Sequence, residues 1–161
     1  MKAMLYQFRG ELVVLWGLAC LPWILPSQAW VPSIIPLLVG LALRAWARRF
    51  IGAHSRGRIL SCPERVSGGP YRWVAHPLYL ANVLVLSGLA SCVIGPHPLG
   101  IALALSGPVL LYAFLAREES KLLAKANPPS RTSPVDVTSG KWRSEWASFL
   151  PPLLLWLLAT R

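Results

Sequence analysis

Hydrophobic positions gather into long, nearly unbroken runs along this chain, and most polar and charged positions lie between the runs. Two runs occupy about residues 12–25 and 30–46, on either side of a short turn at 26–28. At about 1.5 Å per residue, helices of about 16 to 20 residues roughly cover the ~30 Å hydrocarbon layer of a bilayer. The pattern therefore predicts a helical hairpin in the membrane over residues 1–50, with Pro22 bending or ending its first helix.

The second half of the chain shows two more apolar runs, each of which starts at or just after a proline. One run extends from Pro77 to about residue 93, and a proline suits the first turn of a helix. After a turn at 95–98, the next run extends from about residue 99 to 126, where Asn127-Pro128-Pro129 ends it. We expect two further transmembrane helices here.

Three segments lie outside these four helices. Residues 51–66 predict a long polar loop, and residues 127–140 are rich in Pro, Ser and Thr and predict another. The last segment, 142–160, has only about 14 unbroken apolar residues beside Pro151 and Pro152, which leaves open whether it spans, re-enters or lies on the membrane. We predict an all-α fold, a single polytopic membrane helix bundle with four or five transmembrane segments.

Composition and charge favour the same class. Hydrophobic residues make up 55% of the 161 residues and charged residues 14%, so one small core cannot hide the apolar surface. The net charge of +10 would suit a protein that binds nucleic acid. However, the basic residues cluster at one end of the predicted helices: seven lie in 44–72 and six in 117–143, whereas the turns 26–32 and 95–98 have none. Because basic loops stay cytoplasmic, we predict an integral protein of the inner membrane with a cytoplasmic N-terminus, lipid partners and no nucleic acid.

The cysteines and histidines do not cluster. They are spread along the chain without a CxxC pair or neighbouring ligands: Cys20, Cys62, Cys92, His54, His76 and His97. This spacing predicts neither a disulfide framework nor a metal site.

The stretch SGGPYRWVAHPLYLAN, at residues 67–82, places polar side chains at the start of an apolar run. Arg72 and His76 precede Pro77, and Tyr79 follows within the first turn of the predicted helix. The N-terminus of such a helix presents amide N–H groups and a partial positive charge, which suit a carboxylate or a phosphate.

Three polar groups are expected at one face of the membrane. Arg44 and Arg48 end the second predicted helix, residues 71–79 begin the third, and Glu118 and Glu119 lie at the end of the fourth. Adjacent helical residues point about 100° apart, so at most one glutamate faces the bundle interior. The groups can line one pocket, but simpler alternatives remain: arginines that reach the headgroups, acids on the surface, a structural histidine and an interfacial aromatic belt.

The run GLALRAWARRFIG, the stretch at 67–82 and the later REE resemble the isoprenylcysteine carboxyl methyltransferase and phospholipid methyltransferase superfamily. Its hallmark is similar to GPYRxxRHPxYxG, followed by a second apolar hairpin and a glutamate pair. The similarity covers about residues 37–123. The resemblance implies a membrane methyltransferase that uses S-adenosylmethionine, with its active site on the cytoplasmic side and a lipid-like, isoprenoid or prenylated acceptor entering from the bilayer.

Carried over by position, the resemblance implies a set of cofactor-binding residues: Tyr71, His76, Pro77, Tyr79, Glu118 and Glu119. One of the two glutamates would contact the cofactor's ammonium, and Arg72 or the helix amides its carboxylate. Tyr79 would contact the adenine or the sulfonium.

Arg72 and His76 are the implied catalytic residues. A carboxylate acceptor needs no base, whereas an amine or hydroxyl acceptor would lose a proton to His76. Arg44 and Arg48 are expected on the substrate side of the pocket. No metal is implied.

The chain departs from the family pattern at Ala75, where an arginine is usual, at Ala81, where a glycine is usual, and beyond Lys121. We divide the single membrane domain, 1–161, into the hairpin, a cofactor-binding core at 51–126, and a loop with a short apolar segment at 127–161. Two other functions stay open: a catalytically silent membrane scaffold of the same fold, and a membrane reductase that uses a nicotinamide cofactor.

Overall fold

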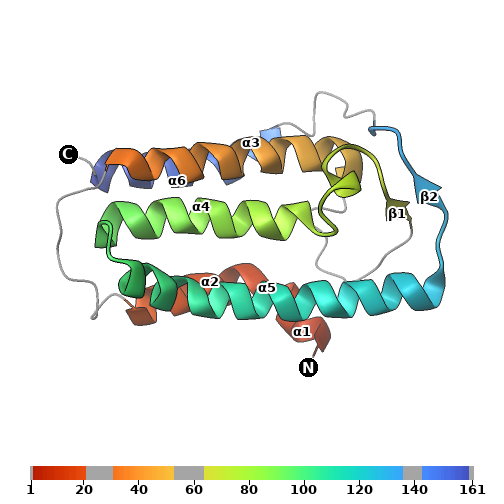
Figure 1. Cartoon of the computed structure of the whole chain (residues 1–161), viewed down its shortest axis with the longest axis horizontal. Coiled ribbons are helices and arrows are strands. Elements are labelled where there is room, and N and C mark those ends of the chain that lie inside the picture. The colour runs from red at the N-terminus through yellow and green to blue at the C-terminus, as the bar shows by residue number, and fades with distance from the viewer. Residues whose placement is uncertain (1, 21–30, 53–63, 136–142, 160–161) are drawn as a thin grey trace.

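The computed structural model describes residues 2–20, 31–52, 64–135 and 143–159 of the chain (Figure 1). Its helical and strand elements have the following bounds: α1 Lys2–Gln7, α2 Arg9–Cys20, the 3₁₀ turn η2 Val31–Ser33, α3 Ile34–Ile51, β1 Arg65–Val66, the 3₁₀ turn η4 Gly69–Arg72, α4 Pro77–Ile94, α5 Pro98–Ala126, β2 Ser130–Arg131 and α6 Arg143–Ala159. The described residues are mainly helical, which confirms the main feature of the predicted all-α class. The helices run roughly along one axis.

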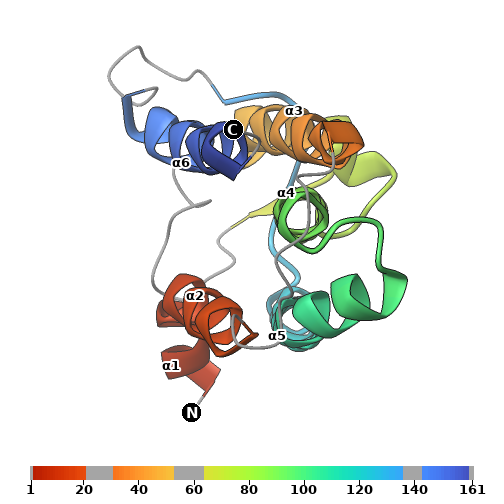
Figure 2. The ribbon, with the colours of Figure 1, turned by 90° about the vertical axis from the view of Figure 1, so that its left-hand side faces the viewer.

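Helix α4 lies between α3 and α5 (Figure 2). Small residues allow α3 and α4 to approach closely. A Cβ atom on Gly40 would come within 2.8 Å of the Val85 backbone nitrogen, and one on Gly88 within 2.8 Å of the Leu37 backbone nitrogen. Ala81, where the family pattern favours glycine, is fully buried. The α3–α4 pair is therefore a tight interface that a larger side chain would force apart.

The N-terminal helices pack differently from the predicted hairpin. Helix α2 lies on α5, where the Trp16 indole donates a hydrogen bond to the Ala104 carbonyl at 3.1 Å and covers Gly107. Helix α3 packs on α4 instead. The difference arises because Gly107 leaves room for an indole on α5, while the glycines of α3 and α4 favour each other. The predicted turn between the two segments and Pro22 lie outside the described residues.

Prolines set the ends of α4 and α5 as expected. Pro77 and Pro98 each occupy the first turn of their helix, where no amide donor is needed. The predicted ends are confirmed to within one residue. Asn127 ends α5 in the left-handed conformation, with φ of 40°. Helix α5 continues through Pro108, which is buried.

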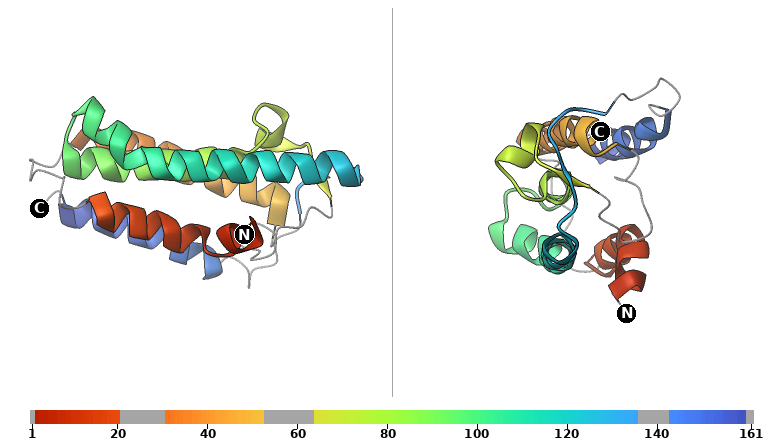
Figure 3. Two further views of the ribbon diagram at one scale, coloured as in Figure 1. Left: turned by 90° about the horizontal axis from the view of Figure 1, so that it is seen from below. Right: turned by 90° about the vertical axis from the view of Figure 1, so that its right-hand side faces the viewer.

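Two short strands, of two residues each, lie in the segments for which the sequence predicted loops. β1 and β2 form a parallel pair with Arg65 opposite Ser130 and Val66 opposite Arg131. Backbone bonds extend the pair, from the Arg65 amide to the Pro129 carbonyl at 2.9 Å and from the Ser67 amide to the Arg131 carbonyl at 3.0 Å. Figures 1 and 3 place these strands at the end of the bundle where α3 and α5 end and α4 begins.

Within the described residues, α4 and α5 are long and apolar enough to cross a membrane. Helix α3 carries three arginines at its end, α2 has 12 residues, and α6 has 17 residues with two internal prolines. Exposed leucine, isoleucine and valine side chains cover α2, α3, α5 and α6. The total of four or five transmembrane segments stays a prediction. Whether the last segment crosses the membrane stays open.

The last helix makes a polar contact with the bundle through Trp156. The Trp156 indole of α6 donates a hydrogen bond to the Ser33 hydroxyl at 2.8 Å, and Ser33 is fully buried. Helix α6 thereby lies beside α3 and α4, at the end of the bundle where η2 begins.

Candidate functional site

A cavity of about 550 Å³ lies where α3 ends, α4 begins and α5 ends. It brings together six of the residues that the sequence singled out: Arg44, Tyr71, Arg72, His76, Tyr79 and Glu119. The His76 and Glu119 positions are more than forty residues apart in the chain. Their meeting in one cavity is the geometry that the same-face argument predicted.

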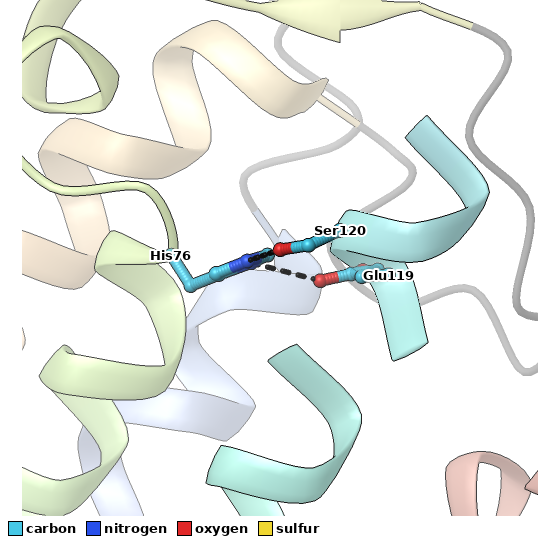
Figure 4. A network of polar contacts seen from close by, with 3 residues as sticks. All are labelled: His76, Glu119 and Ser120. Carbon is cyan, nitrogen blue, oxygen red and sulfur yellow. Dashed lines mark hydrogen bonds and ion pairs between the residues drawn. The ribbon is translucent and has the colours of Figure 1, made fainter. Parts of the chain in front are cut away.

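His76 joins the start of α4 to the end of α5 (Figure 4). It occupies the N-cap position of α4, but its side chain makes no capping bond. Its Nδ1 atom lies 3.1 Å from Oε2 of Glu119, and its Nε2 atom lies 3.0 Å from the Ser120 hydroxyl. Both ring nitrogens of the imidazole thus face consecutive residues of α5.

Aromatic rings continue inward from His76. The His76 and Tyr79 rings stack with centroids 5.6 Å apart, and the Tyr79 and Tyr112 rings stack at 5.3 Å. Tyr79 and Glu119 both line the cavity. The His76 and Tyr79 rings thus border the cavity together with the Glu119 carboxylate, a combination that suits a cation or a planar base.

Arg44 reaches the same region from α3. Its guanidinium donates a hydrogen bond to the Asn82 side-chain oxygen, and the Asn82 amide donates to the Tyr112 hydroxyl at 3.3 Å. A chain of polar contacts therefore links α3, α4 and α5 beside the aromatic stack.

Tyr71 presents a polar atom that no described side chain or backbone group satisfies. Its hydroxyl oxygen is buried and has no hydrogen-bond partner among the described residues. Burial, and after it the negative charge of Glu119, raises the pKa of the Tyr71 hydroxyl, so the group stays protonated at neutral pH. A buried hydroxyl at a cavity wall is suited to a ligand that carries its own donor or acceptor.

Three of the predicted residues do not line the cavity. Pro77 is fully buried and starts α4, and Arg48 is buried on α3. Glu118 is 8% exposed and its Oε1 lies 2.8 Å from the Lys121 ammonium. The two glutamates point to different surroundings, as their helical spacing requires, and Glu119 is the one that faces the cavity.

The sequence did not single out several residues that line the cavity. Tyr6 and Arg9 come from the N-terminal segment, which the sequence assigned to the helical hairpin over residues 1–50. Ser120 follows the glutamate pair, and Asn82 ends the stretch at 67–82. Ser120 directly follows Glu119, a predicted site residue. This adjacency was the only signal in the sequence that could have indicated Ser120.

The strand pair supplies a further wall. Arg131 of β2 lies 3.2 Å from Glu64 and donates to the Phe50 carbonyl at 2.6 Å, which ties the end of α3 to both strands. Arg131 and Glu64 both line the cavity. The two residues of each strand were too few for an alternating pattern, so neither strand was visible in the sequence.

Comparisons with known proteins give a family match for this chain. The model of the family described as "Phospholipid methyltransferase" matches residues 30–127. The chain is 36% identical over 61 residues to the uncharacterized protein YpbQ of Bacillus subtilis (strain 168), a match that covers 37% of this chain and 36% of that protein. No solved structure matches.

The chain thus spans about a third of the length of this curated relative. The family match is longer, covers more than half of the chain, and includes the whole of α4 and α5 with His76 and Glu119. Two of the helices within the matched residues, α4 and α5, are long and apolar enough to cross a membrane. The chain belongs to the phospholipid methyltransferase family, within the isoprenylcysteine carboxyl methyltransferase-like superfamily.

Proposed function

We propose that the protein is an S-adenosylmethionine-dependent methyltransferase that acts on a lipid-like or isoprenoid acceptor in the cavity between α3, α4 and α5. The observation that carries the proposal is the meeting of His76 with Glu119 beside the Tyr79 ring in this cavity. We further propose Tyr71, Arg72, His76, Tyr79 and Glu119 as the residues that bind the cofactor.

The chemistry of the cavity fits the cofactor. Ligand pockets typically enclose about 300–1,000 Å³, and this cavity lies within that range. Glu119 offers a carboxylate to an ammonium group, and Arg72 offers a guanidinium to a carboxylate. The Tyr79 ring, which lines the cavity, offers an aromatic contact to the adenine or the sulfonium, and the buried Tyr71 hydroxyl, which lacks a partner among the described groups, offers a hydrogen bond.

S-adenosylmethionine, when bound, supplies a methyl group on a positively charged sulfur, and the transfer breaks the carbon–sulfur bond with its electron pair left on sulfur. Because the donor is already activated, positioning by the cavity walls contributes the larger part of the acceleration, on the order of 7 to 11 kcal/mol for well-oriented reactants. The tight α3–α4 interface and the proline-fixed start of α4 support such positioning.

Proton removal would use His76 and its partners. Both nitrogens of His76 are engaged, Nδ1 with Glu119 and Nε2 with Ser120. If Nδ1 donates to the carboxylate, Nε2 accepts from the Ser120 hydroxyl. A proton from an amine or hydroxyl acceptor would then reach Nε2 by way of Ser120, whereas a carboxylate acceptor requires no such step.

The apolar part of the lining supports a lipid-like acceptor. Ile51, Leu78 and Leu123 line the cavity beside its charged residues. A ligand with a polar head and an apolar tail matches such a lining.

The two rival functions make different predictions for a purified sample. A silent scaffold would not bind S-adenosylhomocysteine at millimolar concentration, and a reductase would retain a reduced nicotinamide cofactor in preference. The family match favours neither rival.

The decisive experiment is calorimetry with S-adenosylhomocysteine on protein purified in maltoside micelles. Glu119→Gln keeps the size of the side chain and removes its charge, so we expect affinity to fall at least tenfold, about 1.4 kcal/mol. Glu118→Gln is the matched control, because this neighbouring acid does not line the cavity. Far-UV circular dichroism checks that both variants fold.

Two outcomes would contradict the proposal. Wild-type protein that does not bind the ligand at millimolar concentration would favour the silent scaffold. Equal affinity in wild-type protein and Glu119→Gln, with a loss in Glu118→Gln, would remove Glu119 from the cofactor site.

A further inference from the structure

The Trp16 indole donates its hydrogen bond to a carbonyl that the regular hydrogen bonding of α5 cannot satisfy. In an α-helix each carbonyl accepts a hydrogen bond from the amide four residues later, and the residue four positions after Ala104 is Pro108, which has no amide N–H. The Ala104 carbonyl accepts instead from the Trp16 indole at 3.1 Å. A donor on α2 thus takes the place of the donor that α5 lacks.

The position before the proline makes room for the indole. A Cβ atom on Gly107 would lie 2.5 Å from Cδ2 of Trp16, so any side chain at this position would displace the ring from the carbonyl. Gly107 therefore admits the ring, Pro108 leaves the carbonyl without its helical donor, and Trp16 supplies the replacement. The contact needs all three residues.

The apolar surroundings of α5 make this hydrogen bond count. Helix α5 is apolar enough to cross a membrane, and Ala104 lies about 9 Å along it from Pro98. In a hydrocarbon layer no water replaces a missing donor, so a backbone carbonyl without a partner is costly. Lipid tails supply apolar contacts as well as another helix does, whereas they supply no hydrogen bond. The Trp16 bond is therefore a specific reason for α2 to stay on α5.

The same N-terminal helices supply a wall of the cavity. Tyr6 of α1 and Arg9 of α2 both line it. Tyr6 is buried in one cluster with Tyr112 and Leu115, and Val13 of α2 packs against that cluster. Helical backbone bonds of 3.0 and 2.9 Å continue across the junction of α1 and α2. The position of α2 on α5 thus determines where this wall of the cavity lies (Figure 2).

We propose that Trp16 is a positioning residue: by binding the carbonyl that Pro108 leaves without a helical donor, it docks α2 on α5 and holds the N-terminal helices as a wall of the cavity. Trp16 itself does not line the cavity, so it acts on ligand binding through Tyr6 and Arg9. The inference does not depend on which ligand the cavity takes. It concerns a segment outside residues 30–127, which the family model matches.

Spin labels on α2 and α5 measure the docking. Glu11 and Lys125 are exposed, so each is replaced by cysteine and labelled in the full-length protein in dodecyl maltoside micelles. The three native cysteines are first replaced by alanine: Cys20, Cys62 and Cys92. Pulsed electron paramagnetic resonance then gives the distribution of distances between the labels. We expect Trp16→Phe, which keeps an aromatic ring and removes the donor, to broaden this distribution about twofold.

The decisive comparison uses Pro108→Ala, which returns the missing amide to α5. The Ala104 carbonyl then has a donor within its own helix, so the Trp16 bond is no longer needed. We expect Trp16→Phe to add little broadening in the Pro108→Ala background. Equal broadening in both backgrounds would overturn the inference, because the indole would then act independently of the proline. An unchanged distribution in Trp16→Phe, with circular dichroism showing a folded protein, would overturn it as well.

Two controls are matched to these variants. Trp46 is as exposed as Trp16, at 39% and 38%, and lies on α3, so Trp46→Phe should leave the distribution unchanged in both backgrounds. Gly107→Ala should broaden the distribution although alanine favours a helix, whereas Gly17→Ala, where a Cβ atom meets nothing within 4 Å, should not. Equal effects of the two alanines would overturn the role of the space at Gly107.

Ligand binding tests the positioning role separately. Affinity for S-adenosylhomocysteine, measured by calorimetry, should fall about threefold or more in Trp16→Phe and stay within twofold of wild type in Trp46→Phe. A broadened distance distribution with unchanged affinity would overturn the role of Trp16 in shaping the cavity. Wild-type protein that does not bind S-adenosylhomocysteine would refute the proposed function, while the label distances would still decide whether Trp16 docks α2 through the Ala104 carbonyl.

Discussion

Gly68 tests whether the strand pair supports the candidate site. A Cβ atom at this position would lie 1.9 Å from the Thr132 carbonyl oxygen, whereas real Cβ atoms essentially never come within 3.0 Å of another heavy atom. The Gly68 backbone has φ of −92° and ψ of 165°, which any residue adopts. The cost of Gly68→Ala therefore arises from the contact with Thr132 and not from the backbone conformation.

The expected magnitude follows from the contacts that Thr132 would disturb by moving. Two backbone bonds, Arg65 to Pro129 and Ser67 to Arg131, join the strands beside it. Each hydrogen bond typically contributes about 0.5–1.5 kcal/mol, so Gly68→Ala should lower the free energy of unfolding by roughly 1–3 kcal/mol. Ser67 and Arg131 also line the cavity, so affinity for S-adenosylhomocysteine should fall in the same variant.

Denaturant titration in mixed micelles, followed by far-UV circular dichroism, measures the stability, and calorimetry measures the affinity. Gly10→Ala is the control, because a Cβ atom there meets nothing within 4 Å and alanine is favoured over glycine within a helix by about 0.5–1 kcal/mol. A Gly68→Ala protein as stable as wild type, with unchanged affinity, would show that the strand pair does not hold the cavity wall.

Two other substitutions test single contacts. Tyr71→Phe removes a buried hydroxyl that has no partner among the described groups, so stability should be unchanged or rise by up to about 1 kcal/mol, while S-adenosylhomocysteine affinity falls fivefold or more. Because the pKa of Tyr71 is raised, this difference should not vary between about pH 6 and 9; equal affinity in both proteins would exclude the hydroxyl from the site. Trp156→Phe removes the donor to Ser33 and should cost about 1–2 kcal/mol of stability. A double-mutant cycle with Ser33→Ala should give a coupling energy of at least about 0.5 kcal/mol, and additive losses would mean that this bond does not hold α6 in place.

The sequence predicted α4 and α5 well because their ends depend on local chemistry. Pro77, Pro98 and Asn127-Pro128 determine where a helix begins or ends, whatever packs around it. The helical spacing of Glu118 and Glu119 also predicted that at most one of them would face inward. Which one does so depends on the side from which His76 approaches, and that is a tertiary property.

Local sequence chemistry could not predict which helices pack against α2 and α3. Hydropathy identifies an apolar helix, but it does not distinguish one apolar neighbour from another, because all of their surfaces are similar. The pairing of Trp16 with Gly107, and of Gly40 with α4, decided the arrangement. The cavity residues Tyr6 and Arg9 depend on that arrangement, so no sequence pattern indicated them.

The unequal lengths of α4 and α5 have a consequence for where a reaction can take place. Helix α5 has 29 residues and α4 has 18, so at ~1.5 Å per residue they measure about 43 and 27 Å. Glu119 lies about 32 Å along α5 from Pro98, close to the thickness of the hydrocarbon layer. Under the proposed methyltransferase function, and with Pro98 at the opposite surface of the bilayer, the methyl transfer would take place at the interface between the hydrocarbon layer and the aqueous phase. The water-soluble donor and the lipid-dissolved acceptor would then meet without either one leaving its own phase, whatever the length of the acceptor's tail.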